Sequence, residues 1–426
     1  MKKYSQMTKD ELTSEKLALE AEYKKVQELG LDLNMARGKP SIEQLDLNRG
    51  IFEALGKDDD MVSSSGNDTR NYGELTGIKE ARELLAGMMG TTEAHVIALG
   101  NSSLNIMFDQ ISRGYTFGYL GNTPWCKLDK VKWICPVPGY DRHFAITELF
   151  GIEMINVDMK ADGPDMDEVE RLVSSDDSIK GIWCIPKYQN PTGAVFSDKT
   201  VKRFANLKPA AKDFRIFWDN AYCVHHLYDE GEEILDIISE CEKAGNPDMV
   251  FEFASTSKVS IAGGGISGVA SSKANLDDMK KVLTIQTIGA DKVNMLRHVR
   301  FYKNMDGIKE CMKAQASLLR PRFELVLDSL AKEIEPLGLG TWLSPKGGYF
   351  VTFTSLDGCA KRIVSLCKEA GVVLTGAGAP FPYGKDPHDA VIRIAPSYPT
   401  MEELAKACSV FVLCVKLASV EKFLAD

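Results

Sequence analysis

The sequence predicts an α/β protein with a large, mostly parallel sheet and a second, smaller α+β domain. Two observations carry this prediction. Short apolar runs alternate with helical patterns through the middle of the chain, and after about residue 300 one long helical stretch replaces the alternation. The 426 residues suffice for two or three domain-sized units. We expect a large domain over residues 60–300 and a small domain built from residues 1–59 and 301–426.

Five short apolar runs are predicted to be buried strands of the large domain, because each run is flanked by turn residues. They are KVKWICPVPGY, GIEMINVDM, IKGIWCIPKY, FRIFWDNAY and MVFEFAS, with the helical patterns DMDEVERLVSS and SDKTVKRFANLK between them. Functional residues of parallel sheets gather at the carboxyl ends of the strands. The polar residues that follow these runs are therefore the first candidates for a site.

The small domain is predicted to open with a long helix through MDGIKECMKAQASLLRPRFELVLDSLAKEI. Strands at GGYFVTF and AVIRIAPSYP flank a helix at CAKRIVSLCKEAG, and a last amphipathic helix begins with the Thr400–Glu403 capping box. Thr8 and Glu11 form the same pattern near the N-terminus, and we expect the first 55 or so residues to pack with this domain.

Composition excludes several classes of protein. The net charge of −9 argues against a nucleic-acid surface, which needs concentrated basic residues. The first 30 residues lack the apolar core of a signal peptide, and no run is long enough for a membrane span. The ten cysteines are scattered without a C-x-x-C pair, so we expect buried free thiols, no metal site and a cytoplasmic protein.

The stretch STSKVSIAGGGISGVA contains two competing signals. Gly263, Gly265 and Gly268 match G-x-G-x-x-G, but a dinucleotide turn needs a helix afterwards and an acid about 20 residues on. ISGVASS is instead predicted to be a strand, and Asp277 comes too early. Glycines that allow close backbone passage fit better. Lys258 follows a buried strand among small residues, a setting that suits either a surface lysine or a Schiff-base amine.

Other polar residues also follow predicted strands. Asp219 could hold a protonated ring nitrogen or cap a helix, and Tyr222 could bond a ring hydroxyl. Asn190 is either a turn residue or a cofactor donor. Tyr140 and His143 suit ring stacking or core packing.

Two further patterns suit anions. Ser102 and Ser103 begin an apolar-periodic segment, where hydroxyls and free N–H groups either cap a helix or bind an anion. Arg393 lies within the apolar run VIRIAP, so its guanidinium needs a substrate carboxylate or an internal salt bridge.

Taken in order, the motifs resemble those of one family. ARGKP, NYGELTG, GNSS, PGYDRHF, NPTG, DNAY, STSK and RIAP follow one another as in the fold-type-I aminotransferases that use pyridoxal 5'-phosphate, over nearly the whole chain. MARGKP and PGYDRHF are most similar to the divergent aspartate aminotransferase subgroup called class Ic, which is related to MocR-type regulators. The resemblance implies the fold-type-I transferase fold, with residues 60–300 as the cofactor-binding domain.

The resemblance also implies residue roles. Lys258 would form the internal aldimine and move a proton at the substrate Cα, and Asp219 would keep the pyridine nitrogen protonated. Tyr222 and Asn190 would bond the ring oxygen. Tyr140 would stack on the ring, with His143 supporting Asp219 from behind.

The remaining roles concern the phosphate and the substrate. The phosphate would be held by Ser102, Ser103 and Ser255, and by Tyr72 of the neighbouring subunit, which implies a homodimer with shared active sites. The substrate would be bound by Gly38, Asn190 and Arg393, of which Arg393 and Gly38 would take the α-carboxylate.

The sequence departs from the family in two places. Ile266 and Ser267 stand where relatives place a phosphate-binding arginine. Gln286 lies near the place of the arginine that many aspartate aminotransferases use for the distal carboxylate. The candidate substitutes for that second arginine are Arg37, Arg142, Lys292 and Arg300.

We therefore expect a homodimeric aminotransferase that moves an amino group from L-aspartate to 2-oxoglutarate by a ping-pong mechanism, with no nucleic-acid or membrane partner. One alternative keeps the cofactor but changes the substrate or reaction, as in an aromatic, alanine or kynurenine aminotransferase or a β-lyase. Another, of a different class, is a non-catalytic module that senses pyridoxal phosphate or an amino acid.

Overall fold

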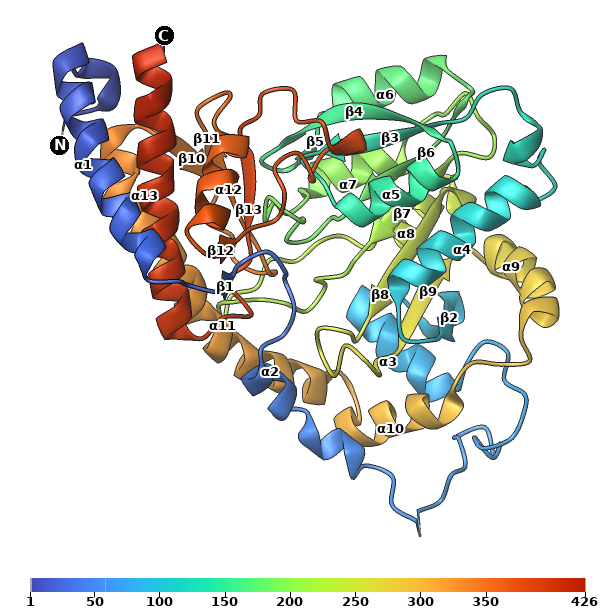
Figure 1. Ribbon diagram of the computed structural model, residues 1–426. Helices are drawn as coiled ribbons and strands as arrows, with labels where there is room; N and C mark the ends of the chain where they lie inside the picture. The colour runs from blue at the N-terminus through green and yellow to red at the C-terminus, as the bar shows by residue number, and fades with distance from the viewer. Residues whose placement is uncertain (1, 58, 426) are drawn as a thin grey trace.

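The computed structural model describes residues 2–57 and 59–425 (Figure 1). An eight-stranded sheet with the order β2-β9-β8-β7-β6-β3-β4-β5 forms the centre of its larger part. Strands β8, β7, β6, β3 and β4 run parallel, whereas β9 is antiparallel to its neighbours and β5 is antiparallel to β4. The strands are β2 (Val96–Leu99), β3 (Lys132–Val137), β4 (Glu153–Lys160), β5 (Gly163–Pro164), β6 (Ile179–Cys184), β7 (Arg215–Asp219), β8 (Val250–Ser255) and β9 (Ser267–Ser271).

Helices cover both faces of this sheet, which is why its central strands are apolar on both sides. Phe217 of β7 packs in the layer with α4 (Ser103–Thr116), α5 (Asp141–Leu149) and α9 (Lys273–Gln286). Its neighbours Ile216 and Trp218 face the other layer. That layer contains α3 (Lys79–Met89), α6 (Met166–Ser175), α7 (Asp198–Ala205), α8 (Ile237–Lys243) and α10 (Lys292–Tyr302).

A three-stranded antiparallel sheet, β10-β11-β13, organises the rest of the chain. Its strands are β10 (Gly340–Trp342), β11 (Val351–Ser355) and β13 (Val391–Ile394), and β1 (Leu33–Asn34) pairs in parallel with β12 (Val372–Val373). The helices are α1 (Lys9–Glu28), α2 (Ile42–Asp46), α11 (Met305–Glu333), α12 (Ala360–Glu369) and α13 (Met401–Ala425). Helices α1 and α13 lie side by side (Figure 1), so the N-terminal segment packs against the C-terminal one as expected.

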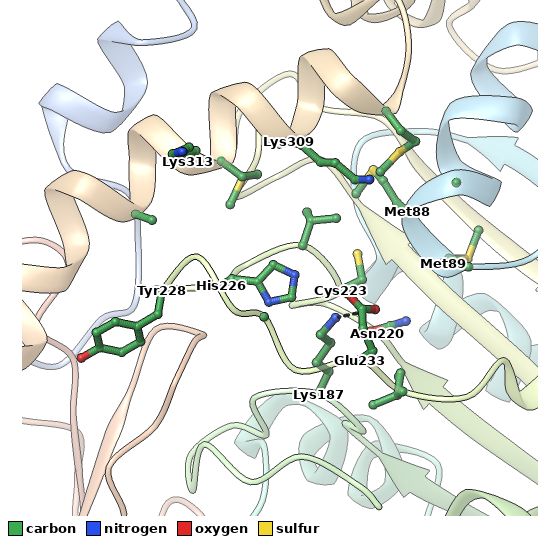
Figure 2. A pocket seen from close by; sticks show the side chains of 18 of the residues that line it. Met88, Met89, Lys187, Asn220, Cys223, His226, Tyr228, Glu233, Lys309 and Lys313 are labelled. Carbon is green, nitrogen blue, oxygen red and sulfur yellow. Dashed lines mark ion pairs between the residues drawn. The ribbon is translucent and has the colours of Figure 1, made fainter. Parts of the chain in front are cut away.

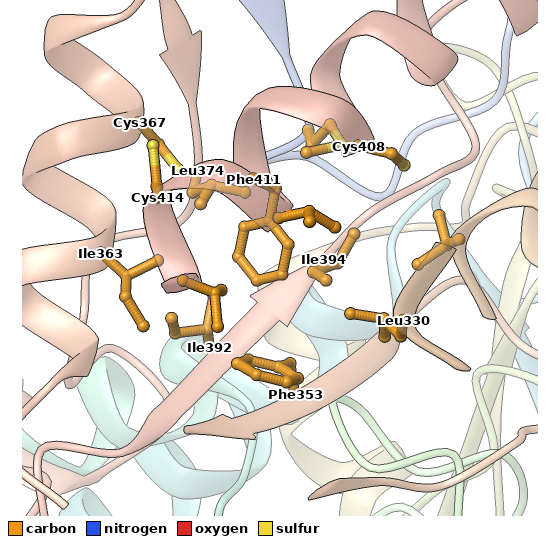
Figure 3. Close-up of a cluster of buried hydrophobic side chains, with 14 of the residues drawn as sticks. Leu330, Phe353, Ile363, Cys367, Leu374, Ile392, Ile394, Cys408, Phe411 and Cys414 are labelled. Atoms are coloured by element: carbon orange, nitrogen blue, oxygen red, sulfur yellow. The ribbon is translucent and has the colours of Figure 1, made fainter. Parts of the chain in front are cut away.

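The core of this second part joins the small sheet to three helices. Figure 3 shows Phe353 of β11 and Ile392 of β13 facing Phe411 of α13, with Ile363 of α12 and Leu330 of α11 closing the cluster. Burial of such side chains contributes roughly 1.5–3 kcal/mol each. The cluster therefore holds β13, and with it Arg393, rigidly in place.

The fold class predicted from the sequence is confirmed. All five predicted strands of the large sheet are present as β3, β4, β6, β7 and β8, and ISGVASS forms β9. Both capping boxes form, with Thr8 and Thr400 each bonded reciprocally to the glutamate three residues on. The boundary between a 60–300 domain and the rest remains our proposal.

The cysteine prediction is partly wrong. None of the ten cysteines forms a disulfide in the described part of the chain, and eight are buried, but Cys126 is exposed and Cys311 is half-buried. Cys126 lies in a short turn whose buried side chain is Trp125. Within the described ranges, no helix is long and apolar enough to cross a membrane, and no cluster of side chains could hold a metal ion.

Candidate active site

The carboxyl ends of β3, β6, β7 and β8 surround a cavity of about 490 Å³. Its lining brings together ten of the residues predicted from the sequence: Gly38, Ser102, Ser103, Tyr140, Asn190, Asp219, Tyr222, Ser255, Lys258 and Arg393. His143 lies directly behind Asp219. Tyr72 lies outside the cavity and is 81% exposed on the loop before α3, so its contact with a neighbouring subunit stays a prediction.

Asp219 ends β7 with one carboxylate oxygen satisfied and the other free. Its Oδ2 lies 2.9 Å from His143 Nε2, and its buried Oδ1 has no hydrogen-bond partner. His143 is itself fixed, because its ring stacks on Trp183 at a centroid distance of 4.3 Å. Burial of a carboxylate oxygen without a hydrogen-bond partner costs free energy. Asp219 Oδ1 is therefore suited to accept a hydrogen bond from a ligand bound in the cavity.

Lys258 is enclosed by aromatic rings. Its Nζ lies 5.0 Å from the centroid of the Tyr222 ring and 5.9 Å from that of Tyr349. Burial lowers the pKa of the Lys258 amine, and the nearby charge of Asp219 opposes that shift only in part. A lowered pKa raises the fraction of neutral, nucleophilic amine near pH 7.

Arg393 projects from β13 into the same cavity. Its Nη1 donates to Asn190 Oδ1 at 3.2 Å and to Asp141 Oδ1 at 3.3 Å, and its Nη2 donates to Thr375 Oγ1 at 3.2 Å. The guanidinium lies 4.7 Å from the centroid of the Phe350 ring. The internal salt bridge predicted as an alternative is thus present, yet it is long, and the buried Nε keeps no partner.

Serine hydroxyls and the N-terminus of α4 also line the cavity. Ser102 caps α4, and Ser103 is the first residue of that helix. Ser255 Oγ donates to Ser257 Oγ at 3.1 Å, and Ser257 in turn donates to the Asn101 carbonyl at 3.1 Å. This combination of hydroxyls with free N–H groups suits a phosphate.

Ile266 does not face this anion site. Its side chain is buried in the core, and its N–H donates to Thr256 Oγ1 at 2.9 Å. A Cβ on Gly265 would lie only 2.9 Å from Thr256 Oγ1, so the glycine permits the close backbone passage that the sequence predicts. A strand, β9, follows the glycines, which excludes a dinucleotide turn.

Two of the four candidates for the distal carboxylate reach the cavity. Arg37 and Arg142 line it, and neither forms an ion pair or side-chain hydrogen bond with the described residues. Lys292 and Arg300 do not line it, and Arg300 points instead toward the Asp60 carbonyl. Gln286 lies elsewhere, where its amide oxygen accepts from Arg113 at 2.7 Å.

Helix α10 supports the segment that follows Lys258. Asn294 Nδ2 donates to the carbonyls of Gly264 and Gly265, and His298 bonds Ser260 through Nε2 at 2.9 Å. His298 Nδ1 lies 2.8 Å from the Asn294 carbonyl, so Nδ1 carries the proton and Nε2 accepts from the Ser260 hydroxyl. Burial lowers the pKa of His298 from 6.5 to about 4.

This shift predicts an acid-sensitive contribution to stability. Between pH 6.5 and about 4 the unfolded chain binds a proton at this position that the native state does not, so stability falls as the pH falls through that window. The free energy of unfolding should differ by up to about 3 kcal/mol between pH 6.5 and pH 4 because of His298, and we expect His298→Gln to remove this difference. Urea unfolding at the two pH values measures it. His388→Gln, at an exposed histidine, is the control; an equal effect there would contradict the assignment.

Several lining residues were missed by sequence analysis. Ser257, within the motif S-x-S-K, was a visible candidate because its hydroxyl is two residues from that of Ser255. Phe350 and Thr375 carry no local signal, since their motifs are those of an ordinary strand and turn. A Cβ on Gly38 would clash with the Phe350 ring, which explains why glycine stands there.

Comparison with known proteins agrees with this geometry. The model of the aspartate amino-transferase family matches residues 7–426. An aspartate aminotransferase of Corynebacterium glutamicum is 45% identical over 92% of this chain and 91% of its own. The crystal structure of an aspartate transaminase from the same species is 42% identical and superposes with a TM-score of 0.96, covering 99% of both chains.

More distant structures share the fold. The α-aminoadipate aminotransferase LysN of Thermus thermophilus, solved with a phosphopyridoxyl-leucine adduct, is 19% identical with a TM-score of 0.73 over 92% of this chain and 93% of its own. Family, close relatives and fold thus agree over the full length described. The chain belongs to the aspartate aminotransferase family and is a pyridoxal-phosphate-dependent aminotransferase of fold type I.

Proposed function

We propose that this enzyme transfers the amino group of L-aspartate to 2-oxoglutarate in a ping-pong reaction. The observation that supports a dicarboxylate is the presence of three arginines, Arg37, Arg142 and Arg393, around the cavity that contains Lys258. One guanidinium suffices for an α-carboxylate, so the unpaired Arg37 and Arg142 are free for the distal one. The name of the Corynebacterium glutamicum relative points to the same substrate.

The residues present fit pyridoxal 5'-phosphate. The unpartnered Asp219 Oδ1 suits a protonated pyridine nitrogen, and the serines at the start of α4 suit the phosphate. Ile266 stands where relatives have a phosphate-binding arginine, and its side chain is buried in the core, so we propose that Ser102, Ser103, Ser255 and backbone N–H groups hold the phosphate. The exposed Tyr72 supports the proposal of a homodimer in which this ring completes the partner's phosphate site.

The bound cofactor supplies an electron sink for negative charge at the substrate Cα. We propose that Asp219 holds the ring nitrogen protonated, and that Asn190 and Tyr222 donate hydrogen bonds to the ring oxygen. Arg393 orients the α-carboxylate, so that the Cα–H bond points toward Lys258. Lys258 Nζ, whose pKa is lowered by burial, would accept the proton from the substrate Cα and return it to C4′ of the cofactor, two bonds away.

A spectroscopic titration tests the substrate proposal. We expect L-aspartate to change the cofactor absorption of the purified holoenzyme at concentrations about 10- to 100-fold below those of L-alanine, because only aspartate engages a second guanidinium. L-phenylalanine serves as the bulky control. A stronger response to L-alanine or L-phenylalanine would refute the aspartate proposal, and a protein that takes up no cofactor would refute the enzyme class.

A further inference from the structure

Figure 2 shows a second cavity, of about 520 Å³, whose lining residues differ from those of the active-site cavity. Its walls come from α3, from α11 and from the segments that follow β6 and β7. It is as large as the active-site cavity, and no residue named above for cofactor or substrate lines it. A pocket of this volume suits a small organic ligand.

The lining is positively charged although the chain carries a net charge of −9. Four cationic side chains, Lys187, Lys309, Lys313 and Arg320, face two acids, Asp229 and Glu233. Asp229, Glu233 and Lys313 lie at the rim, since their side chains are 79%, 86% and 77% exposed, whereas Lys187 is buried. The interior of the pocket therefore favours an anion.

Lys187 is the buried cation of this pocket, with 3% of its surface exposed. Its one ion-pair partner among the described residues is Glu233, at a loose 3.8 Å. Burial lowers the pKa of the Lys187 amine, so the charged form is held at a cost that a bound carboxylate would offset. The side-chain amine of Lys309, which extends from α11 toward Met88 (Figure 2), has no hydrogen bond or ion pair within residues 2–57 and 59–425.

The remaining wall is apolar and adaptable. Methionines from two helices converge there, and unbranched thioether side chains adjust to ligands of varied shape. They are Met88 and Met89 of α3 and Met305 and Met312 of α11. Lys187 comes from the segment after β6, whereas the thioethers and Lys309 come from the helices, and together they match a carboxylic acid with an apolar body.

The two cavities share their walls. At the end of β7 and just after it, Asp219 and Tyr222 line the active site, whereas Asn220 and Cys223 line the second pocket. After β6, Lys187 lines the second pocket and Asn190 the active site. We propose that this pocket is a regulatory site for a small carboxylate with an apolar body, anchored by Lys187 and Lys309, whose occupancy alters the active site through these two segments.

Ligand-observed ¹⁹F NMR on the holoenzyme tests this proposal, with 4-(trifluoromethyl)benzoate as the probe. We expect saturable binding that Lys187→Met weakens by about tenfold or more, because a charged contact in a dry pocket is lost. Lys309→Met, on an exposed side chain that cannot disturb folding, should weaken binding severalfold. Lys332→Met, an exposed lysine of the same helix, is the matched control and should bind as the unmodified enzyme does.

Kinetics provide the second readout. At a concentration near the Kd of the unmodified enzyme, the probe should change the KM for L-aspartate equally in that enzyme and in Lys332→Met, but clearly less in Lys309→Met, whose affinity is severalfold lower. Binding lost in Arg393→Lys yet kept in Lys187→Met and Lys309→Met would place the probe in the active site and overturn the proposal. Absence of saturable binding would overturn it as well, and binding without any kinetic effect would overturn the regulatory role.

Discussion

Lys258→Ala is expected to abolish transamination, with turnover reduced by about 10⁴-fold or more. The amine lies over both the Tyr222 and the Tyr349 ring, and burial lowers its pKa. Alanine removes both the nucleophile and the proton acceptor. Turnover of L-aspartate in a coupled assay measures the effect.

Two controls separate chemistry from structure. Lys258→Arg keeps a cation but offers no neutral amine, and it should be as inactive as the alanine variant. Lys332→Ala replaces an exposed lysine and should leave turnover unchanged. Because alanine leaves the pocket open, a small primary amine in solution should restore part of the activity of Lys258→Ala. An alanine variant with substantial activity of its own would refute the role of Lys258.

Asp219→Asn is expected to lower turnover by about 10²–10⁴-fold, the equivalent of removing one partner of a buried charge pair at roughly 3–5 kcal/mol. The amide cannot hold a protonated ring nitrogen, and it faces His143 with altered hydrogen-bonding capacity. Cofactor affinity should fall together with turnover. Steady-state kinetics and a cofactor titration followed by absorbance measure the two effects.

Asp213→Asn supplies a matched control for the loss of a buried carboxylate. Asp213 accepts hydrogen bonds from Trp125 Nε1 at 2.7 Å and Lys180 Nζ at 2.8 Å, outside both cavities. This variant should lower thermal stability with little effect on cofactor affinity. If both variants lost stability equally and Asp219→Asn kept its turnover, Asp219 would be a structural residue only.

Much of the site could be predicted because its residues lie in short motifs beside strands. Asp219, Asn190 and Lys258 each follow an apolar run, and strand ends of a parallel sheet meet at one edge. The contacts of Arg393 could not be predicted in this way. Its partners Asp141 and Thr375 come from segments whose approach depends on how the small sheet packs against the large one.

The choice among the distal arginines also required the structure. The sequence gives no reason to prefer one of the four candidates Arg37, Arg142, Lys292 and Arg300. In the structure, only Arg37 and Arg142 line the cavity. The second pocket left no sequence signal at all. In the sequence, Lys187 cannot be distinguished from other lysines that follow strands. Its burial in the pocket becomes visible only in the structure, where α3 and α11 form the facing walls.

The sequence by itself predicted the class of fold, because strand periodicity is a local property of the chain, and the order of its motifs, through their resemblance to one family, implied the cofactor and the residues proposed to hold it. Only the tertiary structure decided which arginines share the substrate cavity, how Ile266 turns into the core, and that a second cationic pocket shares the walls of the first. The physical reason is that burial and electrostatic environment arise from segments distant in sequence, and no short motif encodes which of them meet.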